Sequence, residues 1–207
     1  MLKRHTLPVL FIFFGAAGCA SVPTNFEYAG DSEEALLAHE LDGVEYIIAP
    51  VDLANKSVSK KQSRLGNGTT IYSKYIDGKY GLKSLTPGTY AVVNSLTRPS
   101  SLGHYTDTCY EDFAPTFTVK AGTVNVMPSF VELVQGDAVA NDKVLKQASE
   151  TFAKYPKVTS NVEYVDFYGF IDISEKESAD VFRNSCGSGS SFKFLAKDIE
   201  TASKLAK

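Results

Sequence analysis

The 207-residue sequence has no tryptophan, only three cysteines and three histidines, and no excess of basic residues. Its formal net charge of -3 provides no basic field to collect phosphates, so nucleic acid is not an expected partner. A mean hydropathy of -0.10 excludes a polytopic membrane protein. Hydrophobic residues (43%) and charged residues (22%) are close to the globular average, which excludes wholesale disorder and coiled-coil rods.

The sequence also lacks the usual motifs of enzymes and metal centres. It has no H-E-x-x-H pair, no paired C-x-x-C, no EF-hand loop and no phosphate-binding loop. Residues 187–191 are rich in Gly and Ser but do not form G-x-S-x-G, so a flexible loop is expected there. His104, Asp107 and Glu111 could surround a divalent ion, but their spacing matches no metal motif and favours an ordinary polar loop. We therefore predict no cofactor, no metal and no catalytic residue.

The N-terminus has the layout of a secretory signal. Bases at positions 3 and 4 precede an apolar run over 7–14, which is too short for the roughly 20 residues of a membrane-spanning helix. The small residues that follow resemble the lipobox of bacterial lipoproteins, Ala16-Ala17-Gly18-Cys19. The resemblance implies cleavage after residue 18 and acylation of Cys19. An ordinary secretory peptide cut near Ala20 is the alternative.

Lipidation of Cys19 would determine where the protein resides. Two or three acyl chains hold a protein on a bilayer almost permanently. In lipoproteins an Asp after the cysteine often retains the protein in the inner membrane, so Ala20 favours the outer membrane. Loss of residues 1–18 removes two of 21 bases and no acid, which leaves 19 bases against 24 acids and a charge of -5. Membrane contact is therefore expected through the lipid rather than through a basic patch.

Export would place the other two cysteines, Cys109 and Cys186, in an oxidising compartment. There they are expected to form a disulfide, because only one pairing remains once Cys19 is modified. A bridge across about 78 residues would stabilise the fold by roughly 4–5 kcal/mol in the chain-entropy model. Two free, buried thiols are the alternative, since the sequence does not give the distance between the two Cα atoms.

The mature chain begins with residues that lack any apolar period. Residues 19–31 are interpreted as a lipidated tether. A helix N-cap at Asp31, followed by acids in the first turn, predicts a short helix to about Glu40. Strands are predicted over 44–49, 69–76 and from 79 to 82, with a solvated loop over 55–68 and a turn at Asp77-Gly78.

The most distinctive run places a Pro-Gly turn directly before a strand, Leu85-Thr86-Pro87-Gly88-Thr89-Tyr90. Two further short strands flank Gly122 in the run 117–126. Together these patterns, L-x-PG-x-Y and F-x-V-x-AG-x-V, resemble the closing strands of prealbumin-like or carboxypeptidase-regulatory-like β-sandwiches. The resemblance covers about 45 residues, 82–127, and departs from the family at Met127-Pro128, where Tyr-Ile-Gly often follows.

Helical periods appear only in the last third of the chain. Val144, Leu145, Ala148 and Phe152 lie on one face of a predicted helix over 141–154, and shorter helices are predicted near 175–183 and 196–206, the last with Leu195 on its apolar face. Between them, 162–173 is predicted to be one well-buried strand. Asp166 and Asp172 lie inside this apolar run, where a carboxylate either faces solvent or needs a partner.

Together these patterns predict a mainly β protein, an antiparallel β-sandwich with peripheral helices (α+β), after a signal peptide (1–18) and the tether (19–31). Residues 32–207 are predicted to form one domain, with the sandwich core at about 41–134 and a helical and strand part at about 138–207. Tyrosines crowd the sandwich region and could form a binding patch: Tyr72, Tyr75, Tyr80, Tyr90, Tyr105 and Tyr110. The expected function is a non-enzymatic binding or envelope-accessory module that faces the periplasm, with an envelope protein or carbohydrate as partner. A lipid-anchored hydrolase of envelope carbohydrate or peptide, with paired carboxylates, is the alternative.

Overall fold

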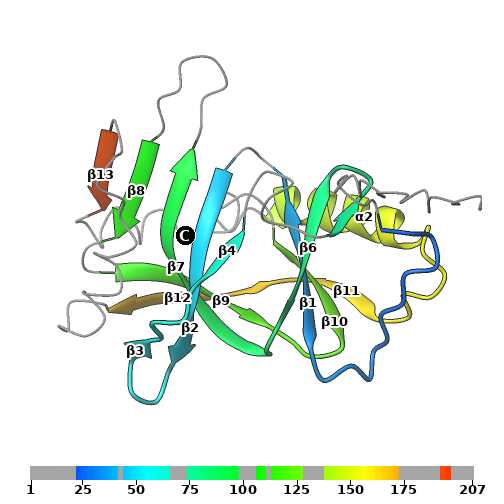
Figure 1. Ribbon diagram of the computed structural model, residues 1–207, viewed down its shortest axis with the longest axis horizontal. Coiled ribbons are helices and arrows are strands. Elements are labelled where there is room, and N and C mark those ends of the chain that lie inside the picture. Colours follow the sequence, from blue (N-terminus) through cyan, green and yellow to red (C-terminus); the bar gives the residue numbers. More distant parts are fainter. Residues whose placement is uncertain are drawn as a thin grey trace, which may run out of the picture.

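Two β-sheets and one α-helix make up the described part of the computed structural model (Figure 1). The structure describes residues 22–41, 44–65, 74–97, 106–110, 113–127, 138–172 and 192–196. The prediction of a mainly β protein is confirmed.

The smaller sheet has five strands in the order β11-β10-β1-β6-β5. Their bounds are β1 (Ala35–Glu40), β5 (Lys74–Ile76), β6 (Tyr80–Leu85), β10 (Thr123–Met127) and β11 (Asn161–Tyr164). Strand β10 runs parallel to both β1 and β11, whereas β6 is antiparallel to β1 and to β5.

The larger sheet has eight strands, with the path β12-β9-β7-β2-β3 and three strands off it, because β8 pairs with β7, β13 with β8, and β4 with β2. Their bounds are β2 (Val44–Asp52), β3 (Ser57–Val58), β4 (Ser63–Leu65), β7 (Gly88–Thr97), β8 (Thr106–Tyr110), β9 (Phe113–Val119), β12 (Asp166–Asp172) and β13 (Phe192–Ala196). All its pairs are antiparallel except β8 with β13. The predicted antiparallel arrangement is therefore wrong for three pairs: β1–β10, β10–β11 and β8–β13.

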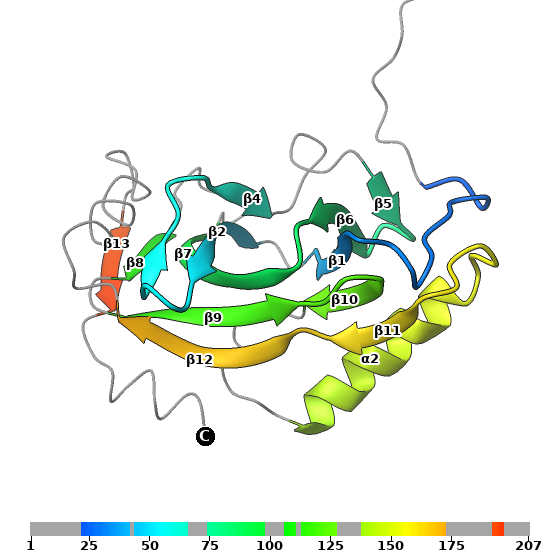
Figure 2. The ribbon, with the colours of Figure 1, turned by 90° about the horizontal axis from the view of Figure 1, so that it is seen from below.

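The chain passes between the two sheets several times, and two of these passages lie side by side. Strands β9 and β10 follow each other through a turn at 120–122, and β11 and β12 follow each other through Val165, whose N–H donates to the Val126 carbonyl at 3.1 Å. Figure 2 shows the two stretches side by side, with β9 next to β12 and β10 next to β11. The run 162–173, predicted as one strand, is thus two strands in different sheets.

Strand β1 is buried on both faces, because side chains alternate along a strand. Ala35 and Leu37 belong to a core that also takes residues from the eight-stranded sheet, including Tyr46, Ile48, Val92 and Phe117. Leu36 and Ala38 belong to a second core, which includes three residues of helix α2 (Ala138–Phe152): Val144, Ala148 and Phe152. The helix predicted over 141–154 is present over 138–152, and three of the four residues of its predicted apolar face are in this core, whereas Leu145 is half-buried. Helix α2 lies against the five-stranded sheet (Figure 2).

The helix predicted from Asp31 to Glu40 is wrong, since Ala35–Glu40 is strand β1. Four consecutive apolar residues, 35–38, suit a strand that is covered on both faces, whereas a surface helix needs a polar face. The Ser32 hydroxyl accepts the N–H of Glu34 at 3.2 Å, so the polar residues before the strand make a local turn.

Other local predictions have mixed outcomes. Asp77 and Gly78, with φ of 50° and 65°, form the predicted turn between β5 and β6. The predicted loop 55–68 contains the short strands β3 and β4. Leu195 lies in β13 and not on a helix. The helix predicted near 175–183, and all but Ala196 of the helix predicted near 196–206, lie outside the described residues.

Candidate functional site

A cleft of about 360 Å³ lies where the chain turns from β6 into β7. Three segments far apart in sequence form its walls: the end of β2, the stretch between β3 and β4, and the turn itself. The lining residues are Pro50, Val51, Lys61, Ser63, Ser84, Leu85, Thr86, Pro87, Gly88, Thr89 and Tyr90.

The predicted Pro-Gly turn builds the floor of this cleft. Gly88 has a φ of 145°, a conformation that side chains with a Cβ rarely adopt. The Tyr90 hydroxyl reaches back across the turn and donates to the Thr86 carbonyl at 2.8 Å. The Tyr90 ring stacks on Phe117, with centroids 6.0 Å apart. Since Tyr90 is buried, stacks on Phe117 and bonds to Thr86, it holds the turn against the core.

Polar and apolar residues line the cleft together. Five lining residues carry hydroxyl groups: Ser63, Ser84, Thr86, Thr89 and Tyr90. The hydroxyls of Thr89 and Tyr90 already bond to the Thr118 hydroxyl and the Thr86 carbonyl. The cation is Lys61, which is exposed. No carboxylate and no histidine is among the described lining residues. The cleft can therefore donate hydrogen bonds and attract an anionic group, but the part of it that the structure describes holds no general acid–base pair.

Two further cations lie close to the lining residues in sequence. Arg64, next to Ser63, pairs with the Glu45 carboxylate at 3.1 Å. Lys83, next to Ser84, donates from Nζ to the Arg64 carbonyl at 2.8 Å, and burial lowers the pKa of Lys83. The ion pair ties β4 to β2, and the Lys83 hydrogen bond ties β4 to β6.

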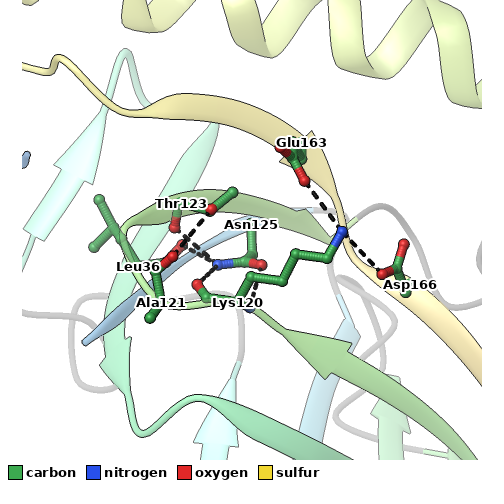
Figure 3. Close-up of polar contacts among 7 residues, drawn as sticks. All are labelled: Leu36, Lys120, Ala121, Thr123, Asn125, Glu163 and Asp166. Carbon is green, nitrogen blue, oxygen red and sulfur yellow. Dashed lines mark hydrogen bonds and ion pairs between the residues drawn. The ribbon is translucent and has the colours of Figure 1, made fainter. Parts of the chain in front are cut away.

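A separate polar cluster lies where the chain crosses between the sheets (Figure 3). Lys120 contacts the carboxylates of Glu163 at 3.2 Å and Asp166 at 3.0 Å. Hydrogen bonds to Asp166 and then to Glu163 raise the pKa of Lys120. Asp166, one of the two acids expected inside an apolar run, is exposed and paired, and Asp172 is exposed at the end of β12. The strand change at Val165 thus brings one acid from each sheet to one lysine.

Beside this cluster, the buried side chain of Asn125 hydrogen-bonds to the backbone of the β9–β10 turn (Figure 3). It is 1% exposed, its side-chain oxygen accepts the Lys120 N–H at 2.8 Å, and its amide nitrogen donates to the carbonyls of Lys120 at 3.0 Å and Thr123 at 2.8 Å. Its amide nitrogen also reaches the Leu36 carbonyl at 3.5 Å. A side chain that satisfies backbone groups in this way shapes the turn and is not available to a ligand.

His39 is the other buried polar group of note. It is fully buried in β1 and meets the Tyr46 ring edge to face, with centroids 5.2 Å apart. Burial lowers the pKa of His39 to about 3, so the ring is neutral at physiological pH. Its burial keeps it away from any substrate in solvent.

The residues singled out in the sequence fall mostly outside these sites. Cys19, Cys186, His104, Glu111 and the stretch 187–191 lie outside the described residues, so lipidation and the disulfide stay predictions. The polar loop predicted around His104, Asp107 and Glu111 is wrong over 106–110, because residues 106–110 pair with β7 and β13 as strand β8. Cys109 and Asp107 lie on the backbone of β8, with Cys109 opposite Asn94 of β7 and next to Leu195 of β13. Over the described ranges, no group of three His, Cys, Asp or Glu could hold a metal ion. No helix within the same ranges is long and apolar enough to cross a membrane.

The expected tyrosine patch is wrong for two of its members. Tyr80 and Tyr90 are buried, at 1% and 5% exposure, and Tyr80 packs near Phe152 of α2. Tyr72 and Tyr105 lie outside the described residues, and the backbones of Tyr75 and Tyr110 lie in β5 and β8. Sequence reasoning missed the cleft itself, for which the Pro-Gly turn was the one available signal.

Comparison with known proteins adds no relative: no family model, no curated protein and no solved structure matches the chain.

Proposed function

We propose that the chain is a bacterial lipoprotein, anchored through Cys19, whose body binds a polar ligand in the cleft at the β6–β7 turn. It acts as a non-enzymatic binding or envelope-accessory module on the periplasmic face of the outer membrane. The lipobox resemblance of residues 16–19 supports the anchor. The observation that carries the binding role is the cleft, with five hydroxyl side chains, Lys61 and no carboxylate among its described lining residues.

The proposed body is a β-sandwich. A core that takes residues from both sheets, such as Leu37 of β1 and Phe117 of β9, supports this proposal, because two sheets packed face to face share one core. Helix α2 then covers the opposite face of the five-stranded sheet. Parallel pairing of β10 with β1 and β11 distinguishes this sandwich from the purely antiparallel type.

The ligand proposed for the cleft is an envelope carbohydrate or protein segment that carries hydroxyl or anionic groups. Hydroxyl side chains both donate and accept, so they suit a ligand of many hydroxyl groups. Lys61 adds attraction for a carboxylate or phosphate on that ligand. The proline rings of Pro50 and Pro87 supply the apolar surface that most ligand sites combine with a few polar groups.

The rival function, hydrolysis, draws less support. In a glycosidase, one carboxyl group is protonated and gives its proton to the leaving group. The other is ionised and attacks the sugar or activates a water molecule. Glu163 and Asp166 are brought together, but Lys120 lies between them and both side chains are well exposed, at 38% and 60%. The mechanism requires one carboxyl group whose buried environment keeps it protonated, and neither member of this exposed pair is buried.

Capture of partners from detergent-solubilised envelope tests the binding role. The intact protein should retain a partner, and the double variant Lys61→Ala, Ser84→Val should lose it while its melting temperature stays unchanged. Lys60→Ala is the matched control, because Lys60 is exposed in the same segment but does not line the cleft. Equal capture by the double variant and the control would contradict the assignment of the cleft.

A hydrolysis screen against cell-wall fragments tests the enzymatic role directly. We expect no turnover by the intact protein. Turnover that disappears in Glu163→Gln or Asp166→Asn, with the fold intact by circular dichroism, would favour the hydrolase.

A further inference from the structure

The first described residues are held against one end of the body and do not hang free. We call residues 22–34 the N-terminal strap. Val22 is 3% exposed and belongs to the same apolar core as Phe152 and Tyr155, and Phe26 packs against that core. Figures 1 and 2 both show the strap, in blue, at the end of the long axis where α2 passes into β11. Most of the segment expected as a tether is therefore part of the folded body.

Tyr28, at the centre of the strap, makes hydrogen bonds to the rest of the body. Its N–H donates to the Lys157 carbonyl at 3.2 Å, and its carbonyl accepts the Thr159 N–H at 3.0 Å, which makes a bridge parallel to Val158. Its hydroxyl donates to the Glu34 carbonyl at 2.7 Å and accepts the Leu36 N–H at 3.0 Å. Burial is the main cause of the raised pKa of Tyr28, so the hydroxyl keeps its proton.

A close glycine contact fastens the second half of the strap. Gly122 has a φ of 61°, and a Cβ placed on it would lie 2.0 Å from the Gly30 carbonyl oxygen. The N–H of Gly122 donates to the Glu34 carbonyl at 3.0 Å. An ion pair between Glu27 and Lys157 adds a contact at the surface. The strap is thus held by backbone bonds to both the β9–β10 turn and the α2–β11 connection.

The docked strap limits how far the body can stand from the lipid. Only Ala20 and Ser21 separate Cys19 from the buried Val22. Three residues of fully extended chain span at most about 10–11 Å. A Cys19 anchored at the bilayer interface therefore keeps Val22 within about one nanometre of it.

We propose that the end of the body formed by the strap and the α2–β11 connection faces the bilayer that carries the acyl chains of Cys19. This orientation rests on the proposed lipidation and adds to it the face that meets the membrane. The other end of the long axis, with the β2–β3 turn and strands β8 and β13, then points away from the bilayer (Figures 1 and 2).

The short link to the lipidated Cys19 holds this face at the membrane, and electrostatic attraction to the lipids does not. The strap carries four acids, at positions 27, 31, 33 and 34, and no base. The neighbouring Lys154 and Lys157 pair with Asp77 and Glu27. Because the face offers no surplus of cations, it gains little from anionic lipids, and the orientation should persist at high salt.

The test places a fluorophore at each end of the intact, membrane-reconstituted protein. An unnatural ketone amino acid at Thr159 or at Asn55 carries the dye, so the three native cysteines stay unlabelled. Both residues are exposed, Thr159 in the α2–β11 connection and Asn55 in the β2–β3 turn. Lipids with a nitroxide on the headgroup quench the dye only at short range. Mass spectrometry of the N-terminal peptide reports lipidation in the same samples.

We expect quenching at Thr159 to exceed that at Asn55 several-fold. A spacer of about 20 Gly and Ser residues between Ser21 and Val22 adds roughly 25 Å of reach and should reduce the quenching at Thr159. Equal quenching at the two positions, or no effect of the spacer, in protein that carries the lipid would overturn the orientation alone. An N-terminal peptide without lipid would overturn the anchor and the orientation together.

Discussion

Replacement of Gly122 by alanine should detach the N-terminal strap, and Gly78→Ala provides the matched control. The two glycines have nearly the same backbone conformation, with φ of 61° and 65°. A Cβ at Gly78 meets nothing within 4 Å, whereas a Cβ at Gly122 would lie 2.0 Å from the oxygen and 2.8 Å from the carbon of the Gly30 carbonyl. Ordinary contacts need roughly 3.5 Å, so the strap or the turn must shift by more than about 1 Å.

The expected magnitudes follow from this difference in space. Both substitutions carry the cost of a left-handed alanine, about 1–2 kcal/mol. Gly122→Ala also weakens the bond from its N–H to the Glu34 carbonyl and the bonds of the Tyr28 hydroxyl, each worth about 0.5–1.5 kcal/mol. We therefore expect Gly122→Ala to lower the free energy of unfolding by about 2 kcal/mol more than Gly78→Ala.

Urea denaturation of the two variants and the parent protein measures the difference. Limited proteolysis adds a local readout, since a detached strap should be cut within residues 22–34 before the body is. Equal losses of stability, together with a strap that resists protease in Gly122→Ala, would refute the close packing of the strap.

Three further predictions concern the core, the cleft and the strand change. Burial lowers the pKa of His39 to about 3, below its usual 6.5, so between these pH values the unfolded chain binds a proton on His39 and the folded chain does not. The free energy of unfolding should therefore fall by up to about 1.4 kcal/mol per pH unit as the pH drops from 6.5 to 3. Urea midpoints measured across this pH range should show a flatter slope for His39→Leu. Gly88→Val should cost about 1–3 kcal/mol, because φ is 145° there, and an unchanged melting temperature would count against the fixed turn. Lys120→Met should cost no more than about 1 kcal/mol in the same melts, since its partners Glu163 and Asp166 are solvent-exposed; a larger loss would mean that the cluster holds the strand change together.

The sequence predicts best those elements whose cause is local. The turn at Asp77-Gly78 and the helix around Val144 and Ala148 follow from neighbouring residues, and the structure has both. The strand at 35–40 was missed because Asp31 and the acids at 33 and 34 have the pattern of a helix N-terminus. Only its non-local neighbours β6 and β10, which cover it on both edges, make it a strand.

The candidate site was even less accessible to sequence reasoning. The cleft combines Pro50, Lys61 and Ser84 from three segments that meet through the pairing of β2 with β4 and β7 and through the contact of Lys83 with Arg64. The break at Val165 was equally hidden, since it depends on a hydrogen bond to Val126 of another strand. By contrast, the Pro-Gly turn was visible because proline and glycine each fix a backbone angle within the chain itself.

Metabolic labelling with an alkyne fatty acid tests the lipid anchor, on which both the location and the orientation of the protein depend. The intact protein should carry the label, Cys109→Ser should keep it, and Cys19→Ser should lose it and release the body from the membrane fraction. Undiminished label on Cys19→Ser, or an unlabelled intact protein in the soluble fraction, would contradict the account.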